Sequence, residues 1–432
     1  MANRLLPWVV GVSAACLSML RLVLQAPAAI GEVLWAEDGL FPLCVVKNDT
    51  ISCLIDPFAG YLLFVPRAVA GVVALFPMQE WAWVANLSAA AVAGLAAGIA
   101  FSTLRREGFS WAASLLVALL IVIAPIVGLE AINAVGSAYI PLLFASSIVV
   151  AYPPHTRGGL VAAGLLLAVT IVTIPSAIVL VLGIVIVAAR GRVAWRVASG
   201  FIGVLVLGGA SQWFVGRSAE TPRSMEITTQ GLTDWISALP LALVSFWPGL
   251  YFGEATTFGI FVIPPFALTG LVLAALAVGV GVWSATRGNP ATAVLLLSGF
   301  GFGAIPTLTG YASNRYFVLP AILWGAALVL AVDARWGRVR RWLMPAVLVG
   351  CLVVWWSAFP ASPWRAGASP EWSAEVERLS SECRGDPGRQ VQVRFTPDWP
   401  MEMTVLDPIT TADALCIEIR EALGVEDGNG FQ

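Results

Sequence analysis

Residues 31–39 read Gly-Glu-Val-Leu-Trp-Ala-Glu-Asp-Gly and follow an apolar run that begins near residue 5. That run, residues 5–25, has the length of a membrane-spanning helix, which needs about 20 apolar residues. Two adjacent carboxylates, Glu37 and Asp38, therefore stand where this helix leaves the membrane. Ionisable groups at such a depth are costly and mark functional sites. A carboxylate at this boundary can serve as a general base or an ion ligand.

The composition is that of a polytopic membrane protein. Hydrophobic residues make up 59% of the 432 residues and charged residues 12%, whereas soluble domains carry about 25% charged residues. The 18 tryptophans suit the aromatic belts at the membrane surfaces. A net charge of only −2 argues against nucleic acid as a partner. All but one of the 24 basic residues are arginine, which is typical of a GC-rich genome and indicates a bacterial inner (plasma) membrane.

Hydrophobic runs predict an all-α fold with about eleven transmembrane helices. They lie near residues 5–25, 82–103, 111–128, 136–153, 158–173, 175–190, 196–215, 257–285, 291–309, 317–333 and 342–358. Arginines gather between alternate runs, so the positive-inside rule places the N-terminus in the cytoplasm and the C-terminus outside.

Two further segments, 57–77 and 227–255, are predicted to lie in the outer interface or to be re-entrant. They belong to the large outer loops 26–81 and 216–256. With the eleven runs, these loops make up a predicted transmembrane domain of residues 1–358.

Residues 359–432 have the sequence of a small polar domain. They contain six basic and thirteen acidic residues, a net charge of −7, whereas the preceding part has a net charge of +5. Residues 390–395 alternate like a strand, 401–406 are expected to pair with it, and 411–423 are expected to form a closing helix. The prediction is a small α+β extracytoplasmic domain, which at about 70 residues needs a covalent staple.

Four of the six cysteines fall in segments predicted to lie outside the membrane: Cys44, Cys53, Cys383 and Cys416. Pairing 44 with 53 and 383 with 416 is the most economical of the three connectivities that four cysteines allow. Disulfides would place these segments in an oxidising compartment such as the periplasm. Free thiols in loops are the alternative.

Several common kinds of site lack their residues in this sequence. The single histidine, His155, falls in a predicted cytoplasmic turn, so neither a zinc site nor a Ser-His-Asp triad is available. No P-loop and no GxGxxG turn between a strand and a helix is present. The sequence identifies no specific cofactor. A divalent cation would be a hard one, Mg²⁺, Mn²⁺ or Ca²⁺, bound through oxygens of Glu37 and Asp38.

Asp38 is the predicted general base, because a carboxylate within hydrogen-bond reach can take the proton of an attacking hydroxyl. Glu37 is its predicted helper, and Trp35 is expected to support the acceptor. The alternative interpretation is a helix cap followed by a solvated Asp-Gly turn.

Basic residues near the predicted outer boundary are candidate ligands of a donor phosphate: Arg315 with its neighbour Tyr316, Arg67 and Arg21. A guanidinium group forms paired charge-assisted hydrogen bonds to phosphate. The alternative is an interfacial arginine that extends toward lipid head groups. Glu130 and Asn133 are expected either to contact the acceptor or to pair with one of these arginines.

These features together resemble the GT-C superfamily of integral-membrane glycosyltransferases. The resemblance rests on three short motifs: Trp35-Ala36-Glu37-Asp38-Gly39, Gly60-Tyr61-Leu62 with Pro66-Arg67, and Asn314-Arg315-Tyr316 with Pro320. It implies a polyprenyl-phosphate sugar donor, an acidic catalytic base and an arginine near the lipid phosphate. Carried over, the base is Asp38 or Glu37, since many members have Asp-Asp or Asp-Glu there, and the arginine is Arg315.

The resemblance implies an inverting glycosyltransferase that moves a sugar to a hydroxyl of a cell-envelope glycan or glycolipid on the outer face of the membrane. A polysaccharide polymerase or ligase with a diphosphate-linked donor is one alternative. A transporter or flippase of lipid-linked sugars is the other. Transporters often have paired repeats and broken helices in matching halves, and the sequence does not clearly contain either.

Overall fold

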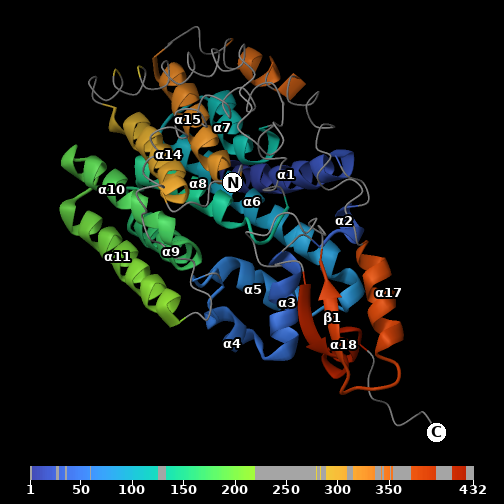
Figure 1. The fold of residues 1–432 in the computed structure, drawn as a ribbon. Helices are drawn as coiled ribbons and strands as arrows, with labels where there is room; N and C mark the ends of the chain where they lie inside the picture. Colours follow the sequence, from blue (N-terminus) through green and yellow to red (C-terminus); the bar gives the residue numbers. More distant parts are fainter. Residues whose placement is uncertain are drawn as a thin grey trace.

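The computed structural model describes residues 2–25, 29–34, 37–58, 60–124, 133–218, 289–308, 315–335, 345–350, 371–395 and 411–424, with the single helical positions 279, 283, 342, 352 and 353. They form a mostly helical protein with one two-stranded antiparallel sheet (Figure 1). Segment 227–255, nearly all of 257–285 and part of 342–358 lie outside these residues.

Apolar helices build the main bundle. In chain order they are α1 (Ala2–Gln25), α6 (Trp81–Arg106), α7 (Trp111–Ile123), α8 (Tyr139–Ala151), α9 (Arg157–Thr173), the 3₁₀ turn η3 (Pro175–Val179) with α10 (Leu180–Ala189), α11 (Trp195–Ser218), α14 (Pro290–Leu308) and α15 (Arg315–Arg335). Side-chain caps mark some helix starts. The hydroxyl of Ser110 accepts from the Ala113 amide before α7, and that of Thr156 accepts from Gly159 before α9.

Three of the described helical segments are long and apolar enough to cross a membrane: Leu5–Leu24, Met78–Arg106 and Trp195–Arg217. The other apolar helical segments have 10–17 residues, with α14 and α15 counted over Pro290–Ile305 and Val318–Ala334. Each coincides with a predicted run, except α5, described below. The helical, membrane-type fold is therefore confirmed, whereas the number of eleven spans and the orientation stay predictions.

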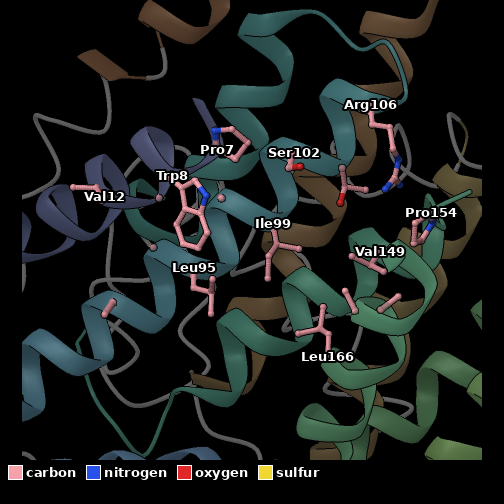
Figure 2. A pocket seen from close by; sticks show the side chains of 18 of the residues that line it. Pro7, Trp8, Val12, Leu95, Ile99, Ser102, Arg106, Val149, Pro154 and Leu166 are labelled. Atoms are coloured by element: carbon pink, nitrogen blue, oxygen red, sulfur yellow. The ribbon is translucent and has the colours of Figure 1, made fainter. Parts of the chain in front are cut away.

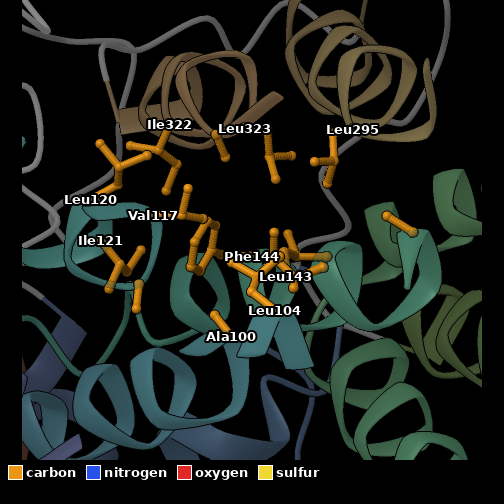
Figure 3. Close-up of a cluster of buried hydrophobic side chains, with 14 of the residues drawn as sticks. Ala100, Leu104, Val117, Leu120, Ile121, Leu143, Phe144, Leu295, Ile322 and Leu323 are labelled. Carbon is orange, nitrogen blue, oxygen red and sulfur yellow. The ribbon is translucent and has the colours of Figure 1, made fainter. Parts of the chain in front are cut away.

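The bundle core is almost purely aliphatic. Figure 3 shows side chains of α6, α7, α8, α14 and α15 converging around Phe144 of α8, which is fully buried. Helices α1 and α6 cross at a glycine contact: a Cβ atom on Gly94 would lie 2.5 Å from the carbonyl oxygen of Gly11. Small residues of this kind let two membrane helices approach closely.

Four short helices and a 3₁₀ turn connect α1 to α6: α2 (Ala29–Glu32), α3 (Glu37–Lys47), α4 (Thr50–Ile55), α5 (Phe64–Val73) and η1 (Met78–Glu80). Asp49 caps α4, its Oδ1 accepting from the amides of Ile51 at 2.8 Å and Ser52 at 2.9 Å. A disulfide joins Cys44 of α3 to Cys53 of α4, as predicted. Helix α5 occupies the middle of segment 57–77 and packs against α3, α4, α6 and α9.

The C-terminal tail contains α17 (Trp372–Glu382), β1 (Gln390–Arg394), β2 (Thr411–Leu415) and α18 (Cys416–Ala422). The predicted disulfide between Cys383 and Cys416 is present. The prediction of a helix over 411–423 is wrong for its first five residues, which pair with β1, Val391 opposite Ala414. Residues 411–415 form a strand and not a helix because alternate side chains of both strands enter one apolar cluster. The predicted partner strand 401–406 lies outside the described residues.

Candidate active site

Asp38 lies in the first turn of α3 and is only 4% exposed. Its Oδ2 accepts a hydrogen bond from the Val135 amide at 2.9 Å, and its Oδ1 accepts from the Gly136 amide at 2.7 Å. Two backbone donors thus hold the carboxylate in one orientation. This arrangement differs from the solvated Asp-Gly turn of the alternative interpretation.

The segment that carries these two amides, residues 133–138, is itself tied to α1. Asn133 adopts a left-handed backbone, φ +52°, which asparagine tolerates better than most residues. Its Oδ1 accepts from the Ser18 hydroxyl, and its Nδ2 donates to the Ser18 carbonyl at 3.2 Å. Asn133 was predicted to contact an acceptor or an arginine; its amide instead joins the segment to α1.

Arg21 lies inside the bundle and is 0% exposed. Its Nη1 donates to the carbonyl oxygens of Val122 and Ala124, both at 2.7 Å. These carbonyls belong to the end of α7, where a helix leaves its last acceptors unsatisfied and where its dipole favours a cation. Arg21 therefore caps α7 from α1 in this structure. That contact differs from the phosphate-binding role predicted for it.

Arg67 is buried beside α3. Its Nη2 donates to Oδ2 of Asp56 at 3.0 Å, and its guanidinium carbon lies 5.3 Å from the centre of the Phe41 ring. Phe41 follows Asp38 by three residues, so the two side chains leave neighbouring positions of one helix face. The Nε of Arg67 is buried and has no hydrogen-bond partner within the described part of the chain. A buried donor without an acceptor costs about 1–3 kcal/mol, which a ligand oxygen would relieve.

The remaining predicted site residues cannot be placed as side chains. Arg315 and Tyr316 begin α15, and Glu37 begins α3, but only their backbone is described. Trp35 and Glu130 lie outside the described residues.

The tail packs directly on the acidic helix. A Cβ atom on Gly39, next to Asp38, would lie 2.1 Å from Cδ1 of Phe395, so the ring rests on this glycine. Phe395 stacks on Trp372, and Trp372 stacks on Trp81 at the start of α6, each pair with ring centres 6.1 Å apart. Figure 1 shows β1 and α18 beside α3. The start of α3 is thus covered by a residue of the tail.

Polar contacts fix the tail in this position. The indole nitrogen of Trp372 donates to the Met78 carbonyl at 2.8 Å, and Glu32 accepts from the Ser373 amide at 2.9 Å. Lys47 at the end of α3 donates to the Asp413 carbonyl at 2.6 Å. The tail therefore contacts α2, α3 and η1, all of which belong to the segment between α1 and α6.

The described residues contain no group of three or more acidic, histidine or cysteine side chains that could hold a metal. Asp38 supplies oxygens of the kind that hard cations prefer, but backbone amides bind both of them. The described residues do not by themselves complete a site for a divalent cation.

The chain is similar to known proteins in its fold and not in its sequence. No protein-family model and no curated protein sequence matches the chain. Among solved structures, the Archaeoglobus fulgidus oligosaccharyltransferase complexed with Zn and sulfate is similar with a TM-score of 0.51 and 14% identity over 88% of this chain. The archaeal oligosaccharyltransferase AglB, complexed with an inhibitory peptide and a dolichol-phosphate, gives a TM-score of 0.50 and 14% identity over 89% of this chain.

The chain spans 55% and 58% of the length of these two structures. Such low identity establishes the architecture alone. The chain shares the fold of these two oligosaccharyltransferases, as its resemblance to the GT-C superfamily predicts, and the subfamily is left open.

Three features of the site were missed by sequence reasoning. They are the amides of Val135 and Gly136, Asp56 as the partner of Arg67, and Phe395 above Gly39. Backbone donors have no residue type that could reveal them. For Asp56, the buried arginine at 67 was a usable signal, since a buried charge needs a partner.

Proposed function

We propose that this protein is an inverting glycosyltransferase that moves a sugar from a polyprenyl-phosphate carrier to a hydroxyl of a cell-envelope glycan or glycolipid. The observation that carries the proposal is the buried carboxylate of Asp38, held by two backbone amides at the start of α3 in a GT-C fold. The reaction takes place on the outer face of the membrane. A hydrophobic carrier keeps the donor at that surface, so a soluble nucleotide sugar is not needed.

In the proposed step, the acceptor hydroxyl oxygen attacks the anomeric carbon of the donor sugar. The bond from that carbon to the phosphate oxygen breaks, and its electron pair leaves with the phosphate. The hydroxyl proton passes to the carboxylate of Asp38, while Glu37 orients the acceptor. Attack from the face opposite the leaving phosphate inverts the anomeric centre. The two amides hold the Asp38 carboxylate in one orientation, so that it is already positioned when the proton transfers.

Arginines stabilise the charge that develops on the departing phosphate. Arg315 is the first candidate, with Tyr316 beside it. Arg67 is the second, supported by its burial near α3 and its unsatisfied Nε. Arg21 is the weakest candidate, because its Nη1 already binds two carbonyls of α7. A divalent cation held by Glu37 and Asp38 would add positive charge at the phosphate.

A second candidate function is transfer from a lipid-linked donor to a peptide. It is favoured by the fold, since one oligosaccharyltransferase of this fold was solved with a peptide and a dolichol-phosphate. Acceptor assays should therefore include peptides as well as glycans and glycolipids.

The test is transfer of radiolabelled sugar from short-chain polyprenyl-phosphate donors by the purified chain in detergent. Asp38→Asn should reduce turnover about 10²–10⁴-fold, the usual contribution of a general base. Glu37→Gln should reduce it less. The matched control is Asp49→Asn, because asparagine caps a helix about as well as aspartate and Asp49 lies exposed in the same segment.

Asp38→Asn is not a neutral change in shape. The asparagine NH₂ group would face one of the two backbone amides, leaving that donor without an acceptor, at a cost of about 1–3 kcal/mol. Thermal stability and donor binding must therefore be measured on the same sample. Lost turnover with donor binding retained supports the proposal. Wild-type turnover in both the Asp38→Asn and Glu37→Gln variants would refute it.

A further inference from the structure

A groove runs along the outside of the bundle between α1, α6 and the neighbouring ends of α8 and α9. Its volume is about 580 Å³. Figure 2 shows Trp8, Leu95, Ile99 and Leu166 around it, with Val12 toward one end and Arg106 and Pro154 at the other. The glycine contact between α1 and α6 forms part of its wall. The groove is therefore apolar along its length and cationic at one end.

One hydrogen-bond donor of Arg106 has no partner among the described residues. Its Nη2 donates to the Tyr152 carbonyl at 2.8 Å, and its Nε lies 3.5 Å from Oε1 of Glu107. Its Nη1 has no hydrogen-bond partner in the part of the chain that the structure describes, and its side chain is 38% exposed. Oε1 of Glu107 also lies 3.7 Å from Nε2 of His155. The end of the groove thus offers a guanidinium group to an anion.

The dimensions match one lipid chain. Along α6 the groove extends from Ala91 to Arg106, which is about 22 Å at the rise of an α-helix. One leaflet of a bilayer has a hydrocarbon depth of about 15 Å. An acyl chain lying in the groove would therefore bring its head group to Arg106.

We propose that this groove binds a membrane phospholipid with an anionic head group, one acyl chain lying between α1 and α6 and the phosphate on Arg106. The proposal does not depend on the catalytic one. The polyprenyl-phosphate donor is not the occupant, because the groove and the carboxylate belong to opposite ends of α6. Arg106 ends this helix, whereas Trp81 at its start, 25 residues or about 37 Å away, belongs to the aromatic stack that ends on Gly39 beside Asp38. A phosphate on Arg106 lies at the opposite end of the bundle from the carboxylate.

The experiment is native mass spectrometry of the purified chain with phosphatidylglycerol and phosphatidylcholine of identical acyl chains. Wild type should retain phosphatidylglycerol at least about tenfold better, the effect of one charge-assisted hydrogen bond. Arg106→Gln should lower phosphatidylglycerol binding to the level of phosphatidylcholine. Ala162→Phe, at an exposed position in the groove, should weaken both lipids and leaves the contacts of Arg106 intact.

Arg190→Gln is the matched control, because Arg190 is an exposed arginine after α10 that does not line the groove. It should bind both lipids as wild type does. Equal retention of the two lipids by wild type would overturn the proposal, and this comparison needs no variant. An equal loss in Arg190→Gln and Arg106→Gln would also overturn it. Displacement of phosphatidylglycerol by equimolar polyprenyl phosphate would assign the groove to the carrier instead.

Discussion

The bundle core and the cluster beneath the C-terminal tail are both apolar, but different kinds of contact hold them together. The bundle core consists of many aliphatic side chains from long continuous apolar runs, each in contact with several others. The cluster under the tail depends on a few features: the stack of Trp81, Trp372 and Phe395, the glycine at 39 and the disulfide of Cys383. Loss of one of these few contacts should therefore loosen the whole tail.

The difference also concerns function. Asp38 and Val135, which bonds it, lie at the edge of the second region. Any loosening of the tail should reach the carboxylate through Gly39 and Phe395. Three pairs of matched substitutions test this dependence. Each pair compares a residue that makes close contacts in or under the tail with a residue of the same type that does not.

The largest effect is expected at the disulfides. Cys383→Ser should lower the stability of the tail by about 2–5 kcal/mol, as for other small stapled domains. Cys16→Ser, at an exposed free cysteine of α1, should change stability by less than about 0.5 kcal/mol. Hydrogen exchange of the α17 amides measures the local free energy of opening. Equal protection in both variants would show that the disulfide does not hold the tail.

A smaller effect is expected at the glycines. Gly39→Ala should cost about 1–3 kcal/mol, because its methyl group would enter the Phe395 ring, which Trp372 holds from one side. Gly203→Ala in α11 should be neutral or stabilising, since nothing lies within 4 Å of the added Cβ.

The double variant Gly39→Ala, Phe395→Leu tests the contact itself. Because a leucine leaves more room for the methyl group, the two changes should cost less together than the sum of their separate costs. Thermal unfolding of the four proteins provides this comparison. Strict additivity would mean that the two residues do not contact each other.

The smallest effect is expected from pH. The hydrogen bond from Arg378 lowers the pKa of Glu382 at the end of α17. Ionised Glu382 therefore stabilises the folded tail above the usual carboxyl pKa of about 4.3, and this contribution is lost as the pH falls through the lowered value. Glu382→Gln should remove that part of the acid sensitivity, by at most about 1 kcal/mol for an exposed pair.

Glu377→Gln is the control for pH, because Glu377 is exposed on the same helix and forms no ion pair with the described residues. Melting temperatures between pH 7 and pH 3 report both variants. If Glu377→Gln and Glu382→Gln changed the profile equally, net charge and not the pair would be responsible.

The features that could be predicted from the sequence are those for which the type of a residue alone indicates its surroundings in the fold. Continuous apolar runs located the helices of the main bundle, and four cysteines gave both disulfides. Asp38 and Arg67 were selected as candidate site residues because a charged side chain in an apolar segment is costly unless it is paired or functional. Thr411–Leu415 was mispredicted, since its pairing with β1 depends on a distant strand and overrides local preference.

The partners of the charged residues could not be predicted in the same way. Asp38 and Val135 are 97 residues apart, and Arg21 and Val122 are 101 apart. In each case the partner is a backbone group, which any residue type offers. The sequence thus indicated which buried charged residues need hydrogen-bond partners, and only the folded chain shows which groups those partners are.

An experimental density map of the chain with a short-chain polyprenyl-phosphate sugar bound would show directly whether the donor lies at Asp38. We expect the sugar beside the carboxylate of Asp38, with the phosphate near Arg315 or Arg67 and Asp38 still bonded to the amides of Val135 and Gly136. Donor phosphate density on Arg106 at the opposite end of the bundle, with none near α3, would contradict it.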